Sequence, residues 1–367
     1  MKPVPRILLL SGASGVGRSV LACLEGRRAP VRIAATSSTP VDAALFDYDA
    51  VYLTPETRRF PDRYAARFEE VLAHFEPDLV IPCRDDDVGF LAEQRLRAPA
   101  MASRLLCGSA AVAAAMLDKL ESARFSASHG LPFAPTLAGG GDFDAARRFA
   151  AAHGFPLVCK PRRGFASHGV RLVFDERQLE QACARPDQVL QKYVGDAEAS
   201  RRLLDDIARR GMPLFHSLEQ GKLSIQAGIA PDGRVAQVAA FENLMRLGRS
   251  EGIRVVDDPR LVAAGRNWAE AFAGAGWRGP LNLQGQRGAD TAFTIFEYNG
   301  RFTGSTVARL LLGFDEVGGA LRDWLGVALP PAAGAPAREA TATLGWRVPH
   351  RDGAERLRRD GYWLRPG

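Results

Sequence analysis

The first hundred residues alternate short apolar strands with helical segments, and this order constrains the fold more than any other feature of the chain. A glycine-rich turn follows the first strand and leads into a helix, and an amphipathic helix over 64–75 precedes the last strand. Strands separated by helices predict a parallel sheet with right-handed crossovers, which is a Rossmann-like layer. The four strands are expected at 6–10, 31–35, 51–53 and 78–82.

Composition limits the class of protein. The chain has 367 residues, of which 46% are hydrophobic and 25% charged, as in an ordinary globular protein of two or three domains. No apolar run reaches the roughly 20 residues that a membrane-spanning helix needs, so no membrane partner is expected. The five cysteines are widely spaced and form no C-x-x-C pair, which favours a reduced cytoplasmic protein without a zinc site.

The charge pattern directs attention to the lysines. Net charge is 48 − 42 = +6, but only five of the 48 basic residues are lysines. The arginines are interleaved with acids and no aromatic–basic module is present, so no nucleic-acid partner is expected. An ammonium and a guanidinium bind phosphate differently. Each internal lysine in this arginine-dominated chain is therefore a candidate for a specific contact.

The turn from Gly12 to Gly17 is close to two nucleotide-binding motifs and matches neither. Arg18 stands where a P-loop has its lysine. The second strand ends without the acidic residue that holds a ribose in a dinucleotide fold. A tight strand-to-helix turn is the favoured interpretation, and a NAD-dependent oxidoreductase using this turn is the less favoured one.

A strand near the end of the chain carries the most informative polar pattern. Glu297, Asn299 and Arg301 alternate with other residues, so the period of two places all three on one face. The preceding strand can add Gln284 to that face. Carboxylate and amide oxygens suit Mg²⁺, and the arginine can neutralise a phosphate or an oxyanion. The alternative is the polar outer face of an edge strand.

Lys160 ends a strand that reads as buried, and a turn rich in backbone amides runs from Gly164 to Gly169. Successive backbone N–H groups of this kind can cover phosphates. A surface hairpin would explain the glycines. It would not explain a lone lysine in a buried strand.

The order of these motifs resembles the ATP-grasp superfamily, and most of all its carbamoyl-phosphate-synthetase-like branch. The resemblance covers roughly residues 4–325 and rests on five motifs in order. These motifs are Asp118-Lys119, Val158-Cys-Lys160-Pro161 with the glycine turn, Gln191-Lys-Tyr193-Val194, Gln284, and Glu297-Tyr-Asn299-Gly-Arg301.

The resemblance implies an α/β chain that is α+β in its grasp domains. A Rossmann-like pre-ATP-grasp domain would precede an ATP-grasp fold with a mobile lid subdomain. The expected boundaries are 1–115 for the Rossmann-like domain, 116–190 for the lid, 191–330 for the C-terminal core with an inserted helix near 197–210, and 331–367 for a linker and arginine-rich tail.

The same resemblance implies a role for each site residue. Arg301 would steady an acyl phosphate and, with Lys160, take part in catalysis. Two Mg²⁺ ions, or Mn²⁺ in their place, would be held by Gln284, Glu297 and Asn299. The ATP contacts would be Lys119, Lys160, Gly164, Ser167, Gly169, Gln191, Tyr193, Val194 and Glu198.

Residues 195–222 depart from the family's pattern, in which the hinge leads directly into the strand whose glutamate binds ribose. Glu198 keeps the usual spacing from Gln191, whereas alignment to the following strand puts Lys222 there. The ribose contact therefore stays open between these residues and another. An amphipathic pattern over 203–207 indicates a helix that packs on the surface, caps the substrate or forms a homodimer contact.

The activity implied by the resemblance is an ATP-dependent ligase that joins a small carboxylate to an amine, such as an amino acid, through an acyl phosphate. A non-catalytic ATP-binding regulator with the same fold is the alternative. The candidate substrate contacts are Arg246, Arg249 and Ser250 in a loop over 243–252 that follows a strand over 235–242, and Thr303 and Ser305 after the strand that carries Glu297. Asp85 and Asp86 are also candidates, although the N-cap and first turn of an ordinary helix explain these two aspartates equally well.

Overall fold

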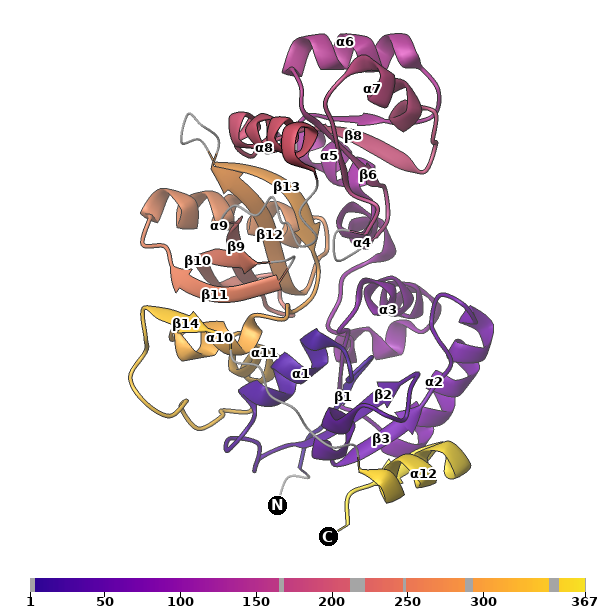
Figure 1. Cartoon of the computed structure of the whole chain (residues 1–367). Coiled ribbons are helices and arrows are strands. Elements are labelled where there is room, and N and C mark those ends of the chain that lie inside the picture. The colour runs from indigo at the N-terminus through magenta and orange to yellow at the C-terminus, as the bar shows by residue number, and fades with distance from the viewer. Residues whose placement is uncertain are drawn as a thin grey trace.

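The computed structural model describes residues 4–164, 168–211, 222–246, 249–287, 293–342 and 350–366. Three sheets, formed by different parts of the chain, make up its architecture (Figure 1). Within the described residues, no helix has both the length and the apolar character needed to cross a membrane.

The N-terminal domain contains the expected Rossmann-like layer. Its strands are parallel in the order β3-β2-β1-β4, and they pair in register, with Leu8 opposite both Ala34 and Val80. Short 3-10 helices cover Ala43–Asp47 and Pro99–Arg104. The elements are β1 (Arg6–Leu9), α1 (Gly15–Cys23), β2 (Arg32–Ser37), β3 (Ala50–Leu53), α2 (Pro61–Phe75), β4 (Leu79–Ile81) and α3 (Asp85–Arg97).

The second sheet lies in the segment predicted to be the lid, and we call it the lid for that reason. It is antiparallel in the order β5-β8-β6-β7, and its two helices pack over a small apolar core that includes Leu157, Leu179 and Leu190. The elements are β5 (Thr136–Ala138), α6 (Phe143–His153), β6 (Leu157–Pro161), β7 (Arg171–Val173), α7 (Glu176–Cys183) and β8 (Gln188–Lys192).

The third sheet is antiparallel, in the order β13-β12-β9-β10-β11-β14, with α9 packed against β9 and β10. The loop predicted over 243–252 is wrong in its described part, because β10 extends to Arg246, β11 begins at Arg249, and the two strands pair Met245 with Ser250. The elements are β9 (Lys222–Ile229), β10 (Val235–Arg246), β11 (Arg249–Val255), α9 (Pro259–Gly274), β12 (Gly279–Arg287), β13 (Phe293–Asn299), α10 (Thr306–Leu311), α11 (Glu316–Leu325) and β14 (Glu339–Thr341).

The lid is preceded by two consecutive helices, α4 (Ala110–Leu117) and α5 (Lys119–Ser128), because Asp118 breaks the first and caps the second. Its extended backbone ends α4, and its side chain accepts the N–H groups of Leu120 and Glu121. This break puts Lys119 at the start of a new helix, directed differently from the first.

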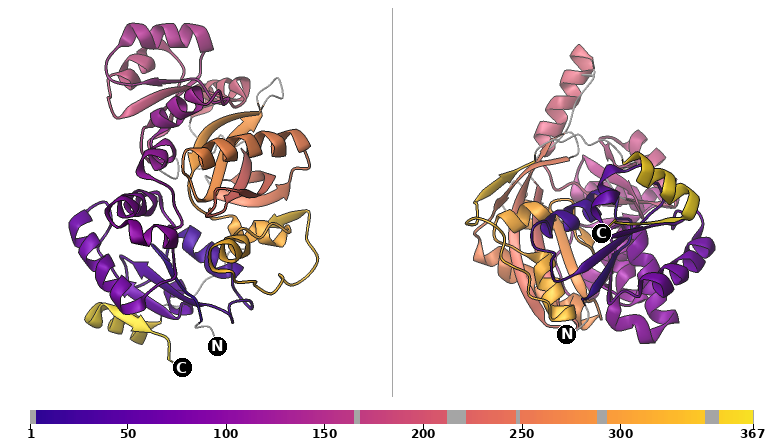
Figure 2. Two further views of the ribbon diagram at one scale, coloured as in Figure 1. Left: turned by 180° about the vertical axis from the view of Figure 1, so that it is seen from behind. Right: turned by 90° about the horizontal axis from the view of Figure 1, so that it is seen from below.

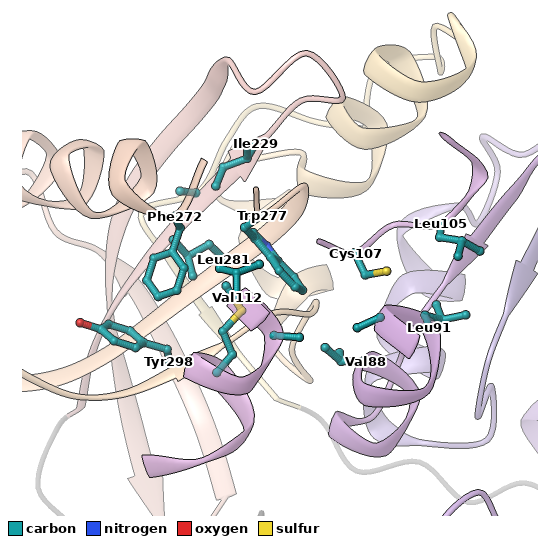
Figure 3. Close-up of a cluster of buried hydrophobic side chains, with 14 of the residues drawn as sticks. Val88, Leu91, Leu105, Cys107, Val112, Ile229, Phe272, Trp277, Leu281 and Tyr298 are labelled. Carbon is teal, nitrogen blue, oxygen red and sulfur yellow. The ribbon is translucent and has the colours of Figure 1, made fainter. Parts of the chain in front are cut away.

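One apolar core joins the N-terminal domain to the third sheet. Val88 and Leu91 of α3 and Val112 of α4 belong to the same buried cluster as Trp277 and Tyr298 (Figure 3). Because this core is continuous, the cleft between the two domains has a fixed apolar floor beneath it.

The end of the chain returns to the first sheet. α12 (Arg351–Asp360) leads to β15 (Tyr362–Leu364), which pairs antiparallel with β3 and buries Trp363. The sequence predicts a linker and tail over 331–367, and the described part of it includes an edge strand of the N-terminal domain. An edge strand without such a partner exposes unpaired backbone groups.

The expected helix near 197–210 is present as α8 (Ala197–Arg210). It projects from the rest of the molecule in the right-hand view of Figure 2, and Ser200 is its one buried residue. Its predicted role in a substrate cap or a homodimer stays a prediction.

Candidate active site

A cavity of about 220 Å³ lies where the N-terminal domain, the α4–α5 junction, the lid loop and β13 meet. Its walls therefore come from segments far apart in the sequence. The lining residues that the sequence singled out are Asp85, Asp86, Lys119, Gly164, Glu297 and Asn299.

The amide and carboxylate side chains predicted to bind metal lie on one face of two paired strands. Gln284 stands opposite Glu297 in the β12–β13 register, and Asn282 stands opposite Asn299. Asn282 Oδ1 accepts hydrogen bonds of 3.2 Å from Gln284 Nε2 and of 3.2 Å from Asn299 Nδ2. Both ligand amides are thus fixed through their nitrogens. Their oxygens, with the Glu297 carboxylate, form a hard-oxygen donor set that fits Mg²⁺.

Asn282 is a site residue that the sequence analysis missed. It is buried, and it shares the face of Gln284 because it lies two positions earlier on the same strand. The period of two could have identified it. On sequence alone it has no partner, because its contact with Asn299 depends on the pairing of two strands.

The turn after the metal strand has no room for a side chain. A Cβ on Gly300 would lie 2.5 Å from Met116 Sδ and 2.5 Å from the ring of Trp277. This close approach to α4 and to the buried tryptophan fixes the end of β13, and with it the position of Asn299.

Two lysines approach Glu297 from different elements. Lys119 Nζ, at the start of α5, lies 3.9 Å from Glu297 Oε1 and donates a 3.2 Å hydrogen bond to Gly164 O. Lys160 Nζ, on β6 of the lid, donates to Phe296 O at 3.2 Å and lies 5.5 Å from the centre of the Phe296 ring. Lys119 therefore lines the cavity beside Glu297, whereas Lys160 is held at the preceding residue of β13.

Burial lowers the pKa of Lys160 to about 8, while the charge of Glu297 opposes this shift and the charges of Lys119 and Lys222 add to it. The free protein therefore loses this positive charge as the pH rises through about 8. A bound polyphosphate would restore the charge by raising the pKa again.

This shift predicts a proton linkage for nucleotide binding. Binding of MgADP should take up close to one proton at about pH 9 and little at about pH 7, since a protonated amine gains nothing further. Affinity should accordingly fall as the pH rises above about 8. Calorimetry in buffers of different ionisation enthalpy measures the uptake. Equal uptake at both pH values would contradict the linkage.

Arg301 is paired with the N-terminal domain. Its Nε donates to Asp85 Oδ1 at 2.6 Å, and a further guanidinium nitrogen donates to Asn299 Oδ1 at 3.4 Å. Burial lowers the pKa of Arg301, but the carboxylate of Asp85 outweighs it and the net pKa is raised. Asp85, which the sequence offered as a substrate contact, thus holds the arginine beside the metal set. Asp86 faces Arg58 instead, with 3.4 Å between Oδ1 and Nε.

The residues predicted to bind adenine and ribose lie near the lid. Gln191 is buried on β8 and donates to Thr136 Oγ1, and Tyr193 and Val194 are half-buried after it. Glu198 is exposed on α8, lies 3.4 Å from Arg202 and does not line the cavity. The charge of Lys222, the other ribose alternative, lowers the pKa of Lys160.

The structure describes some of the remaining predicted residues and not others. Gly169 has φ +74°, which glycine adopts without strain, while Ser167 lies outside the described residues. Thr303 Oγ1 accepts hydrogen bonds from Arg309 and from the N–H of Ser305, so it braces the turn after the metal strand. Of the hairpin candidates, Ser250 Oγ donates to Asn243 Oδ1, and the side chains of Arg246 and Arg249 are outside what the structure describes.

The Gly12–Gly17 turn serves the packing of the first sheet. Tyr48 Oη lies 3.1 Å from Gly12 O and 3.2 Å from Gly17 O, and a Cβ on Gly17 would lie 2.5 Å from Gly12 O. Ser14 caps α1 by accepting the Gly17 N–H. These contacts support the favoured interpretation of a tight strand-to-helix turn.

This chain is similar to known proteins in its three-dimensional structure. No family model matches the sequence, and no curated protein matches it. The biotin carboxylase domain dimer of 2-oxoglutarate carboxylase from Hydrogenobacter thermophilus, solved with MgADP, ADP and bicarbonate, is 18% identical with a TM-score of 0.62, over 88% of this chain and 70% of that chain.

Two further solved structures are similar. Biotin carboxylase from Campylobacter jejuni is 17% identical with a TM-score of 0.64, over 89% of this chain and 72% of that chain. N5-carboxyaminoimidazole synthetase from Staphylococcus aureus is 12% identical with a TM-score of 0.64, over 90% and 80%. The chain therefore shares its fold with these biotin carboxylases and this synthetase, and the fold begins with the Rossmann-like domain that the sequence predicts.

Proposed function

We propose that this protein is an ATP-dependent ligase that activates a carboxylate as an acyl phosphate and joins it to an amine. The observation that carries the proposal is that Lys119, Glu297 and Asn299 line one interdomain cavity, while Gln284 stands opposite Glu297 and Lys160 bonds to the neighbouring Phe296. Cations and hard-oxygen donors that lie this close together can bind the phosphates of a nucleotide and the metal ion that accompanies them.

The proposed reaction has two steps. A carboxylate oxygen of the first substrate attacks the γ-phosphorus of ATP and ADP leaves. The amine then attacks the acyl carbon, phosphate leaves, and the amine loses a proton to solvent. Mg²⁺, held by Gln284, Glu297 and Asn299, would neutralise phosphate charge. The protein supplies positioning and electrostatic stabilisation, which phosphoryl transfer chiefly requires.

Each cation of the site has a distinct part in this proposal. Lys160 and Lys119 hold the phosphates from the lid side and from the α5 side. Arg301, fixed by Asp85 at the inner end of the metal strand, faces the acyl phosphate and the oxyanion that forms when the amine attacks. A guanidinium held by a carboxylate costs little reorganisation during the reaction.

The amine side of the cavity lies against α3. Asp86 and Glu93 face the cavity with Gly89 between them, at the spacing of one helical face, and Phe90, Met116 and Leu117 add apolar surface. Arg58, the partner of Asp86, has a side chain that is 64% exposed, so an ammonium could replace it. An amino acid or a similar small amine with an apolar body fits this wall.

Product analysis with a panel of carboxylates and amines tests the proposal. ATP should give ADP and phosphate when a competent pair is supplied, and release of AMP and pyrophosphate would contradict the acyl phosphate. Thermal shift separates the alternatives. Stabilisation by MgATP without turnover on any pair would favour a regulator, and stabilisation by NAD alone would favour an oxidoreductase at the Gly12–Gly17 turn.

A further inference from the structure

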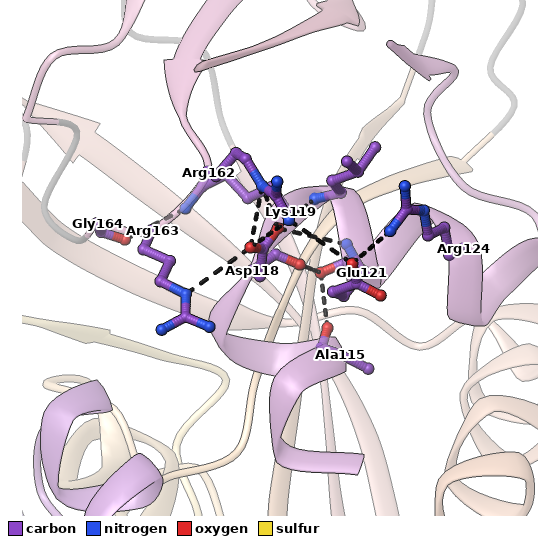
Figure 4. Close-up of polar contacts among 10 residues, drawn as sticks. Ala115, Asp118, Lys119, Glu121, Arg124, Arg162, Arg163 and Gly164 are labelled. Atoms are coloured by element: carbon purple, nitrogen blue, oxygen red, sulfur yellow. Dashed lines mark hydrogen bonds and ion pairs between the residues drawn. The ribbon is translucent and has the colours of Figure 1, made fainter. Parts of the chain in front are cut away.

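Asp118, at the junction of α4 and α5, both caps a helix and binds an arginine. The Asp118 side chain is only 5% exposed, and it caps α5 by accepting the Leu120 N–H at 2.9 Å. It also receives the guanidinium of Arg162, whose Nε lies 3.1 Å and 3.0 Å from the two carboxylate oxygens and whose terminal nitrogen lies 2.8 Å from one of them (Figure 4). Paired contacts between planar groups fix direction as well as distance.

Backbone contacts close the same connection. The Lys119 N–H donates to Arg162 O at 2.9 Å, and the Lys119 ammonium donates to Gly164 O at 3.2 Å. The Arg162 N–H donates to Asp187 O at 2.8 Å, within the lid. The segment that leads from β6 into the glycine turn is therefore attached to the first residues of α5 by both its main chain and its side chains.

The helix α5 is in turn fixed to the C-terminal core. Ser126 Oγ lies 2.7 Å from Tyr298 Oη, and the rings of Phe125 and Phe272 stack with 4.3 Å between centres. Residues attached to the start of α5 thus take their position from β13 and α9. These contacts fix the position of the lid segment relative to Glu297, which lies on β13.

We infer that Asp118 and Arg162 are a positioning pair that sets the start of the lid's glycine turn and the Lys119 ammonium against Glu297 before a nucleotide binds. The inference rests on the proposed nucleotide site. Both residues act through Lys119 and Gly164, so they are positioning residues. If these groups are already ordered in the free protein, nucleotide binding avoids the entropic cost of ordering them.

The electrostatics agree with this geometry. Burial raises the pKa of Asp118, but hydrogen bonds from Arg162 and from the Leu120 N–H outweigh it, and the net pKa is lowered. The carboxylate is therefore charged at neutral pH, as a charge-assisted contact requires. Arg163 Nε lies 3.7 Å from the same carboxylate, but its side chain is 67% exposed and adds little.

The test separates the charge contact from helix capping. Asp118→Asn keeps a good N-cap and removes the charge, and Arg162→Met removes the guanidinium. Each should weaken MgADP binding by about tenfold, the loss typical of one charge-assisted contact. The double variant should lose no more than either single one, and Arg162→Lys should restore part of the affinity. Arg124→Met, which breaks the exposed contact with Glu121, is the matched control and should bind normally.

A second measurement is made without nucleotide. Hydrogen exchange of the Lys119 and Arg162 amides should be faster in both single variants than in the parent protein or in Arg124→Met, at unchanged melting temperature. Additive losses of affinity, or unchanged exchange, would overturn the inference. If the parent protein fails to bind MgADP, the proposed function fails, and exchange alone then decides whether the pair positions this segment.

Discussion

Replacing Glu297 with glutamine is expected to abolish the Mg²⁺ dependence of nucleotide binding and to lower turnover by at least about 100-fold. The carboxylate lies between Gln284 on the paired strand and the Lys119 ammonium. Glutamine keeps the shape and loses the charge, so phosphates would be bound without a correctly placed ion. The side chain is 27% exposed and lies at a cavity wall, and the fold should therefore be retained.

A matched control exists on the same sheet. The Glu242 side chain on β10 is also 27% exposed, and its carboxylate lies 2.6 Å from an Arg254 guanidinium nitrogen. In the sheet, β12 and β9 separate β10 from β13. Glu242→Gln should keep both the Mg²⁺ dependence and the turnover. Titration of ADP with and without Mg²⁺ by calorimetry gives the first quantity. A Glu297→Gln protein that still binds ADP more tightly with Mg²⁺ would remove Glu297 from the metal set.

The parts of the site that could be predicted from sequence are those set by local geometry. Glu297, Asn299 and Arg301 share a face because a strand repeats every two residues, and no long-range contact is needed to know it. The Rossmann-like order of strands follows from their alternation with helices, for the same reason. Lys119 and Lys160 stood out because lysine is rare in this chain.

The contacts that could not be predicted join distant segments. Arg301 and Asp85 are 216 positions apart, and the packing of α3 on α4 and of α4 on β13 brings them together. On sequence alone this aspartate is a candidate substrate contact, and that assignment stays a prediction. The same limit hid the contact between Asn282 and Asn299, which depends on strand register.

Two strands have no clear signal in the sequence. The hairpin of β10 and β11 contains Asn243, Arg246 and Arg249, which are polar and read as a loop. Pairing of β10 with β11, with β9 beside β10 only as far as Asn243, overrides this weak local preference. β15 is only three residues long, and its place beside β3 follows from the path of the whole chain.

Replacing Lys160 with methionine is expected to weaken MgADP binding by about 10- to 100-fold, the range for losing a hydrogen bond to a charged group. The Lys160 side chain is 5% exposed, and it lies over the Phe296 ring. Methionine matches its length and is apolar, so burial should favour the variant's fold rather than disrupt it. The variant should also lose the proton uptake near pH 9, because the amine that titrates at about 8 is gone.

Lys192→Met is the matched control for this substitution. Lys192 lies on β8, directly beside β6 in the same sheet, and its side chain is exposed. The control should keep both the affinity and the proton uptake, since an exposed ammonium outside the cavity adds only a screened charge. Calorimetry of the two variants at about pH 7 and about pH 9 makes the comparison. If Lys160→Met bound MgADP as tightly as Lys192→Met, the buried ammonium would have no phosphate to hold, and the nucleotide would have to lie elsewhere.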